Sequence, residues 1–294
     1  MKQTTGERIF NVFNIIIMVA FMLAIVLPLL NVVSTSLVSA QEVAGKEFIL
    51  FPSKVDLGAY KLILSNGSVI VNGYKITIFR VVVGTFVNLL FTYFLAYGLS
   101  KKKLPGRNGI TIYIFITMLF SGGLIPYYIL IRYIGLINNL FVYILPGLVS
   151  AWNTLLLRNF IMNIPESLFE SAELDGAKET IIIFKIVLPL SLPAMATIGL
   201  FYAVGHWNSW WDAFLFVSNP KLQPVQLVLR NILSVSQVSI SKVGGTVRST
   251  MSSPPPSRAI QNAVIVVSTV PVVLIYPFVQ KYFVKGIMVG SVKG

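Results

Sequence analysis

The sequence predicts an all-α integral membrane protein with six transmembrane helices and both termini in the cytoplasm. Hydrophobic residues make up 55% of the 294 residues and charged residues only 11%, whereas soluble domains carry about 25% charged residues. The apolar residues gather in stretches of about 20, the length that an α-helix needs to cross the hydrocarbon core of a bilayer. We therefore expect residues 1–294 to form a single multi-pass domain in the cell membrane.

The apolar stretches give six predicted spans in chain order. Several contain Pro, Gly or a charged residue, and such interruptions are tolerated where a helix packs against protein. The first stretch could instead belong to a signal peptide, because Lys2 and Arg8 precede it and Val38-Ser39-Ala40 follows it. It is longer than a signal peptide's hydrophobic region, which has about 7–15 residues, so we favour a retained helix. The spans are about residues 9–33, 76–99, 110–131, 140–159, 184–205 and 261–283.

The distribution of Lys and Arg between the short loops predicts the orientation. Loop 101–108, "KKKLPGRN", carries four basic residues, whereas loop 132–139, "RYIGLINN", carries one. Positively charged loops remain in the cytoplasm. Loops 101–108 and 160–183 therefore lie inside the cell with both termini, and the longer loops 34–75 and 206–260 face outward.

The composition argues against several classes of function. The chain has no cysteine and one histidine, His206, so we expect no metal site and no His-based catalytic triad. It also lacks a phosphate-binding loop of the form GxxxxGK[ST], so we expect no ATP hydrolysis, no catalytic residue and no cofactor in this chain. The net charge of +13 is explained by membrane orientation, and we expect no nucleic-acid partner.

The predicted cytoplasmic loop 160–183 holds an unusual share of the acidic residues. Pro165 suits the first turn of a helix, and Ser167 followed by Glu170 matches a capping box. Gly176 predicts a turn at the end of this helix, after which a second short helix over 177–185 leads into the next span. Of only ten Asp and Glu in the chain, five lie in this loop: Glu166, Glu170, Glu173, Asp175 and Glu179.

The first of these short helices also has a small apolar face. Leu168, Phe169 and Ala172 lie at positions i, i+1 and i+4, between acidic residues. The segment is too acidic to insert into lipid and too apolar on one face to be an ordinary solvated loop. An amphipathic helix of this kind is suited to a groove on another protein, so we predict that it docks.

The same segment resembles a known signature. Glu170-Ser171-Ala172, then Gly176 after three residues, then Ile186-Val187-Leu188-Pro189 after nine, is similar to the EAA motif of binding-protein-dependent ABC importer permeases. The one departure is Ser171, which stands where the motif has Ala. "FPSKVDLGAYKLIL" (51–64), "SGGLIPYYILI" (121–131) and "YPFVQKYFVKGIMVGSVKG" (276–294) look like the sugar-importer branch, within it the permeases for oligosaccharides.

This resemblance implies the type I fold of ABC importer permeases and a function as one permease subunit of an ATP-driven sugar importer. It implies a second, different permease, two ATP-binding subunits that hold ATP and Mg²⁺, and an extracytoplasmic sugar-binding protein as partners. It also implies that loop 160–183 is the coupling helix that seats on an ATP-binding subunit. The implied docking residues are Glu166, Leu168, Phe169, Glu170, Ser171, Ala172, Asp175, Gly176 and Ala177.

The sequence offers several residues for the substrate path, each with a structural alternative. Gly and Pro breaks at 121–126 and 146–147 either line a cavity or mark kinked packing. In "HWNSWWDA" (206–213), Trp rings stack on sugars or else form an interfacial belt. We read Arg80 and Arg158 as snorkelling anchors and His206 as a plain interfacial residue. The predicted path residues are Asn153, Trp207, Asn208 and Trp211.

The predicted outer loop 206–260 is basic, which would suit an anionic sugar such as a fragment of alginate or pectin. An acidic face on the binding protein would explain the same charge. The basic residues are Lys221, Arg230, Lys242, Arg248 and Arg258, against the single acid Asp212.

The alternative function is an ion-coupled secondary transporter. Such a protein needs carboxylates within the membrane to bind Na⁺ or H⁺. None of the ten acidic residues falls inside a predicted span, which argues against this alternative.

Overall fold

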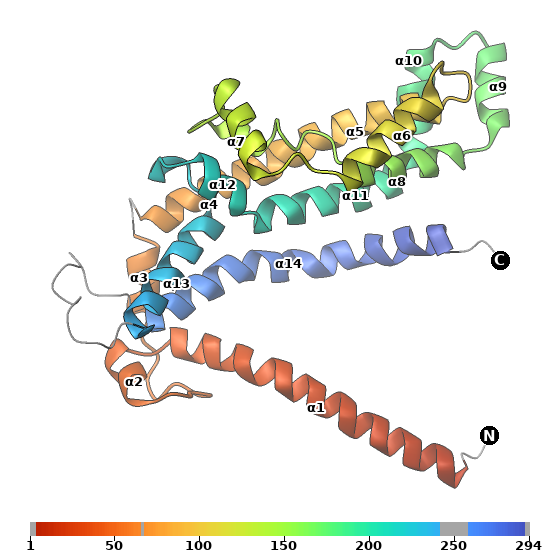
Figure 1. The fold of residues 1–294 in the computed structure, drawn as a ribbon. Helices are drawn as coiled ribbons and strands as arrows, with labels where there is room; N and C mark the ends of the chain where they lie inside the picture. The colour runs from red at the N-terminus through yellow and green to blue at the C-terminus, as the bar shows by residue number, and fades with distance from the viewer. Residues whose placement is uncertain (1–3, 66–67, 242–257, 292–294) are drawn as a thin grey trace. The chain divides into compact units, whose positions relative to one another are not determined.

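The computed structural model describes residues 4–65, 68–241 and 258–291, and every regular element within them is a helix (Figure 1). This confirms the all-α prediction for the described residues. The chain divides into two compact units, residues 1–71 with 229–272 and residues 72–228 with 273–294. The boundaries between the units fall within helices α4 (Val69–Phe79), α13 (Val225–Ser241) and α14 (Arg258–Ser291).

The first unit begins with α1 (Thr5–Ser36), a single helix of 32 residues. A capping box starts it, in which Thr4 Oγ1 accepts from the backbone N–H of Glu7 and Glu7 accepts from that of Thr4. Its apolar side chains are exposed along most of its length, so the helix needs apolar surroundings outside this chain. Two short helices follow, α2 (Ala40–Gly45) and α3 (Gly58–Ile63). Val43 of α2 packs with Val38, Ile49 and Ala259 in a small core.

The second unit opens with one long helix and one bent pair. Helix α4, the π-helical segment η1 (Arg80–Gly84) and α5 (Thr85–Ser100) run without interruption. Helices α6 (Arg107–Leu119) and α7 (Leu124–Tyr133) meet at an angle of 114°. The break between them falls at the predicted interruption Ser121-Gly122-Gly123, so predicted span 110–131 is not one straight helix.

Residues 140–159 form two helices instead of one. A 3-10 turn, η2 (Leu140–Tyr143), precedes the Pro146-Gly147 break, and α8 (Ala151–Met162) follows it. Polar side chains from neighbouring helices satisfy the irregular backbone. Asn88 Nδ2 donates to the Gly147 carbonyl at 3.1 Å, and the Ser150 N–H donates to the Tyr202 hydroxyl at 2.9 Å. Backbone outside a regular helix is stable at membrane depth when protein groups pair with it in this way.

The rest of the second unit contains the predicted coupling loop and the segment after the fifth predicted span. Helix α9 (Glu166–Leu174) is followed by α10 (Glu179–Ile181), the π-helical η3 (Ile182–Val187) and α11 (Leu188–Asn208). Helix α12 (Trp211–Phe216) and the 3-10 turn η4 (Pro220–Leu222) lead into α13. In Figure 1, α9 and α10 lie at one end of this unit, beside the turn between α5 and α6.

Two buried clusters hold the second unit together. One joins α5, α8, α9, η3 and α11 through residues that include Tyr97, Ile161 and Ala172. The other joins α7, η2, α12 and α13 through Ile131, Tyr143, Phe216 and Leu227. Burial of side chains of this size contributes about 1.5–3 kcal/mol each. Both of the short, partly polar helices, α9 and α12, are therefore fixed to the longer helices by apolar contacts.

Among the described residues, three helices are long and apolar enough to cross a membrane: Thr5–Ser36, Val69–Ser100 and Glu179–Asn208. The bent pair α6–α7 makes a fourth if it is counted as one span. These helices overlap residues 9–33, 76–99 and 184–205, and their length and composition are consistent with a membrane protein.

Candidate functional site

The predicted coupling segment forms a helix, as expected, but the helix begins differently. Pro165 is the N-cap of α9 and lies outside the helix, and no side chain caps the first turn. The predicted capping box of Ser167 and Glu170 is therefore wrong. Because the helix starts at Glu166, Ser167 already lies within the first turn, where it is not placed to act as the N-cap.

The turn predicted at Gly176 is confirmed. Gly176 has φ +74°, a left-handed conformation that costs other L-residues about 1–2 kcal/mol. The Ala177 N–H donates to the Ala172 carbonyl at 2.9 Å, and the Gly176 N–H donates to the Glu173 carbonyl at 3.0 Å. This pair of bonds is a Schellman motif, and it ends α9 sharply.

The predicted second short helix over 177–185 is wrong. Helix α10 begins at Glu179 and continues through the π-helical η3 into α11, so that Glu179–Asn208 is one helix of 30 residues. The segment that follows the Gly176 turn is thus the first part of a long helix.

The apolar residues of α9 divide between two faces. Ala172 is buried, and Phe169 and Ala177 pack partly buried against the same core as Tyr97. Leu168 and Leu174 point away from this core, with exposed fractions of 42% and 89%. The sequence analysis missed Leu174, although it follows Glu170 by one helical turn and directly precedes the predicted turn.

The remaining docking residues named from the sequence lie on the outer surface of the segment. They are exposed, as are the apolar side chains of Leu168 and Leu174. The accessible part of the segment therefore carries acidic, small and apolar residues. These exposed residues are Glu166, Glu170, Ser171, Asp175 and Gly176.

Basic residues after α5 pair with two of the five acids. Lys101 Nζ lies 2.8 Å from Glu179 Oε1, and Lys102 Nζ lies 2.6 Å from Glu166 Oε2. The hydrogen bond and charge of Lys102 hold the pKa of Glu166 below its usual value, so this carboxylate is ionised at neutral pH. The loop "KKKLPGRN", which predicted the orientation, therefore also contacts the predicted coupling segment.

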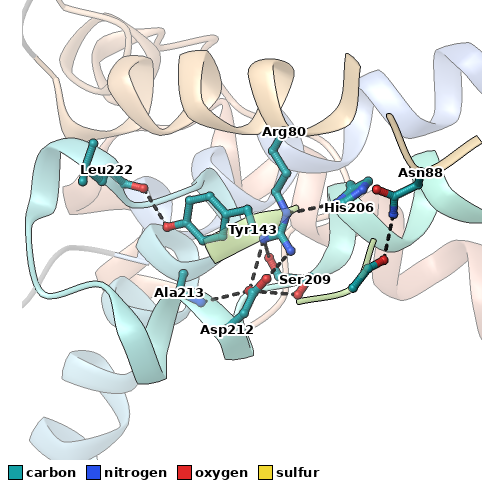
Figure 2. A network of polar contacts seen from close by, with 9 residues as sticks. Arg80, Asn88, Tyr143, His206, Ser209, Asp212, Ala213 and Leu222 are labelled. Atoms are coloured by element: carbon teal, nitrogen blue, oxygen red, sulfur yellow. Dashed lines mark hydrogen bonds and ion pairs between the residues drawn. The ribbon is translucent and has the colours of Figure 1, made fainter. Parts of the chain in front are cut away.

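A second polar cluster surrounds Arg80 (Figure 2). Its guanidinium forms an ion pair with the Asp212 carboxylate, in which Nη1 donates to Oδ1 at 3.1 Å and Nη2 donates to Oδ2. Nη1 also donates to the Ser209 carbonyl at 3.2 Å. The guanidinium carbon lies 4.7 Å from the centre of the Tyr143 ring, a cation–π contact.

Arg80 and His206 are both buried, with exposed fractions of 3% and 8%. The predictions of a snorkelling Arg80 and an interfacial His206 are therefore wrong. Arg80 Nε donates to His206 Nδ1 at 3.3 Å, an arrangement in which His206 carries its proton on Nε2. A Cβ at Gly84 would lie 2.6 Å from that Nε2, so only glycine allows η1 and α11 to approach this closely.

Asp212 also organises its own helix. Its Oδ1 accepts from the Ala213 N–H at 2.9 Å and from the Ser209 hydroxyl at 3.0 Å. The same carboxylate thus caps the turn between α11 and α12 and neutralises Arg80. This side chain therefore links the start of α12 to η1, in addition to the apolar contacts of α12.

The residues predicted for the substrate path lie in different surroundings. Asn153 is buried near the start of α8, with an exposed fraction of 6%. Trp207 is half-buried, with its ring 6.2 Å from that of Tyr74, whereas Asn208 and Trp211 are exposed. The Trp211 ring stacks on that of Phe214 with centroids 5.8 Å apart, which gives an aromatic surface on α12.

The basic residues of predicted loop 206–260 are described only in part. Lys221 lies in η4, Arg230 in α13, and Arg258 donates to the Glu47 carbonyl at 3.0 Å. Lys242, Arg248 and the Ser- and Pro-rich stretch around them lie outside the described residues. Arg158, predicted to be an anchor, is half-buried and donates to the Leu99 carbonyl at 3.0 Å.

The helices of membrane-spanning length and the bent pair α6–α7 define a class of protein, an all-helical chain with several helices long and apolar enough to cross a membrane. No family model matches the chain. It is 43% identical over 291 residues to the polygalacturonan/rhamnogalacturonan transport system permease protein YtcP of Bacillus subtilis (strain 168), covering 98% of this chain and 99% of that one. It is 38% identical over 294 residues to protein LplC of the same organism, covering 100% and 98%.

A solved structure agrees with these relatives. A bacterial ABC transporter involved in the import of the acidic polysaccharide alginate has a chain that matches with a TM-score of 0.85 and 30% identity, covering 96% of this chain and 99% of that chain. The chain belongs to the permease subunits of sugar ABC transport systems. Nothing in these similarities supports the ion-coupled alternative.

Proposed function

We propose that this chain forms half of the translocation path of an ATP-driven sugar importer, with a second permease forming the other half. Two ATP-binding subunits supply the energy and hold ATP and Mg²⁺, and an extracytoplasmic binding protein delivers the sugar. The chain crosses the cell membrane six times with both termini in the cytoplasm. The distribution of Lys and Arg between its short loops supports this orientation.

The coupling segment is the observation that carries the proposal. Helix α9 protrudes from the second unit (Figure 1), and Glu170, Ser171 and Leu174 on it are exposed. We assign the contact with the ATP-binding subunit to its exposed residues and add Leu174 to those named from the sequence. Phe169, Ala172 and Ala177 support the segment from within the core. An exposed apolar side chain on an amphipathic helix is suited to a groove on a partner protein.

The proposed substrate is an acidic oligosaccharide. The names of two similar proteins, one for polygalacturonan and rhamnogalacturonan and one for the acidic polysaccharide alginate, support this choice. The excess of basic over acidic residues in the predicted outer loop 206–260 would favour an anionic solute. Asn208 and the exposed Trp211 are the residues of the path most accessible to a sugar, with Asn153 and Trp207 deeper in the protein.

Gly176 provides the sharpest test of the docking role, because a matched control exists. Gly176 and Gly135 both have a left-handed backbone, with φ +74° and +73°, and a Cβ added at either position would have no atom within 4 Å. Replacement of either by Ala therefore costs about 1–2 kcal/mol of backbone strain and nothing else. We expect Gly176→Ala to reduce copurification of the ATP-binding subunits, whereas Gly135→Ala does not.

Two results would count against this proposal. If both variants retain the ATP-binding subunits equally, the turn at Gly176 does not position the contact. If the unmodified chain fails to copurify with any ATP-binding subunit, the chain is not part of an ATP-driven importer. Thermal stability of both variants is measured in parallel, and equal losses show that the comparison is matched.

A further inference from the structure

Lys101 lies where three elements of the second unit meet. It is the C-cap of α5, and its side chain has an exposed fraction of 30%. Its Nζ lies 2.8 Å from Glu179 Oε1 on α10. The same nitrogen lies 4.8 Å from the centre of the Tyr97 ring on α5 and 5.3 Å from that of the Phe169 ring on α9. A single ammonium group therefore contacts α5, α9 and the first turn of the long helix that contains α11.

Contacts around Lys101 make this junction firm. The buried Tyr97 donates its hydroxyl hydrogen to the Glu179 carboxylate, so Glu179 is held by two side chains from α5. One turn earlier in α5, the Tyr93 hydroxyl donates to the Ile183 carbonyl at 2.7 Å. Phe169 packs against the core that contains Tyr93 and Tyr97. The two carboxyl–lysine pairs of the loop differ in exposure, because Lys101 and Glu179 are 30% and 54% exposed. Lys102 and Glu166 are 69% and 65% exposed.

We propose that Lys101 is a positioning residue that makes α9 and the C-terminal end of α5 move together. This inference rests on the proposed function, in which an ATP-binding subunit displaces α9. A displacement at one site changes the rest of a protein only through contacts that join the two. The chain connects α9 to its neighbours by the turns at Pro165 and Gly176, and neither turn leads to α5. Phe169 and Ala172 share an apolar core with Tyr97 of α5. Lys101 adds a link between the same two helices that depends on its charge, and α5 packs in turn on α8 and α11.

The chemistry favours Lys101 over Lys102 for this role. A cation placed between two aromatic rings and a carboxylate interacts more strongly when it is partly removed from water. An exposed pair such as Lys102–Glu166 is screened by solvent and contributes little. Lys102→Met therefore removes the same charge from the same loop while leaving the junction intact, which makes it the matched control.

The test uses the whole complex, with both permeases, the ATP-binding subunits and the binding protein, in lipid nanodiscs. The rate of ATP hydrolysis is measured first without the binding protein. It is then measured with the binding protein added together with a digest of polygalacturonan. We expect the Lys101→Met chain to assemble into the complex and to retain the ATP hydrolysis measured without the binding protein. The increase in hydrolysis caused by the loaded binding protein should fall at least about fivefold, which is the low end of typical couplings between sites. Lys101→Arg should retain most of the stimulation because it keeps the cation, and Lys102→Met should match the unmodified complex.

A second measurement needs no sugar. The chain has no cysteine, so Leu90→Cys places a single reporter on α5. Trapping of the ATP-binding subunits with vanadate should change the maleimide labelling rate of this reporter, and Lys101→Met should reduce that change at least about fivefold. If the Lys101→Met chain does not reach the membrane, Glu179→Gln removes the same ion pair. This variant should show the same reduction in stimulated hydrolysis and in the change of labelling rate.

Equal stimulation and equal labelling changes in Lys101→Met and the unmodified complex would overturn the role of Lys101, while the proposed function would stand. Failure of Lys101→Met to retain the ATP-binding subunits would also overturn it, because the residue would then act in docking. Failure of the unmodified chain to retain those subunits would instead refute the proposed function.

Discussion

The ion pair of Arg80 and Asp212 gives a quantitative prediction. Arg80→Met removes the guanidinium but keeps most of the side chain's length and apolar contacts. It leaves Asp212, whose side chain has an exposed fraction of 24%, without its cation. Loss of one partner of a buried ion pair costs about 3–5 kcal/mol. Because Asp212 keeps two hydrogen bonds and some solvent contact, we expect the lower value, about 3 kcal/mol.

The size of this effect can be measured by thermal unfolding of the purified complex in detergent. For a chain of this size, about 3 kcal/mol corresponds to a fall in melting temperature of roughly 6–12 °C. Asp212→Asn in the Arg80→Met background should recover part of the loss, because no unpaired carboxylate remains. Lys102→Met, which breaks an exposed pair, should cost less than about 1 kcal/mol.

Two results would refute the reasoning. One is a fall in melting temperature for Arg80→Met no larger than that for Lys102→Met. This result would mean that water reaches the Arg80–Asp212 ion pair. The other is strict additivity of Arg80→Met and Asp212→Asn, which would mean that the two side chains do not interact.

Three further predictions concern the close helix contact, the docking surface and the substrate. Gly84→Ala should destabilise the protein by about 1–3 kcal/mol, because its Cβ would meet the buried His206. Gly98→Ala, with open space around its Cβ, should be neutral or slightly stabilising in the same unfolding assay, and equal effects would contradict the contact. Leu174→Asp should leave thermal stability unchanged, because Leu174 is 89% exposed, but should weaken binding of the ATP-binding subunits about tenfold or more; unaltered binding in pull-down titrations would remove Leu174 from the interface. Oligogalacturonate should compete for uptake better than a neutral oligosaccharide of the same length, and a preference for the neutral sugar would rule out an acidic substrate.

The sequence predicted those features that depend on local pattern. The length of the apolar stretches gave the long helices, and the Ser-Gly-Gly run gave the break between α6 and α7. The glycine at 176 gave a left-handed turn at the end of a short acidic helix. The sequence also predicted the family, because the EAA motif around Glu170 and Gly176 is recognised by the spacing of residues within one continuous segment.

Features that depend on distant residues were beyond the sequence. Arg80 and Asp212 are separated by 132 positions, so an arginine at the start of a span looked like an anchor at the lipid surface. The interfacial prediction for His206 fails for the same reason, because the partner of His206 comes from another helix. The extent of the helix after Gly176 was underestimated, since the π-helical segment η3 joins α10 to α11 without a break in composition. Leu174 was overlooked because its exposure depends on which face of α9 meets the core.

Sugar uptake by proteoliposomes tests the central claim most directly. Vesicles that contain this chain, the second permease and the ATP-binding subunits should accumulate oligogalacturonate only when ATP and the binding protein are both supplied. Vesicles that contain this chain alone should accumulate none. Accumulation by the chain alone, driven by a proton or sodium gradient, would contradict the account.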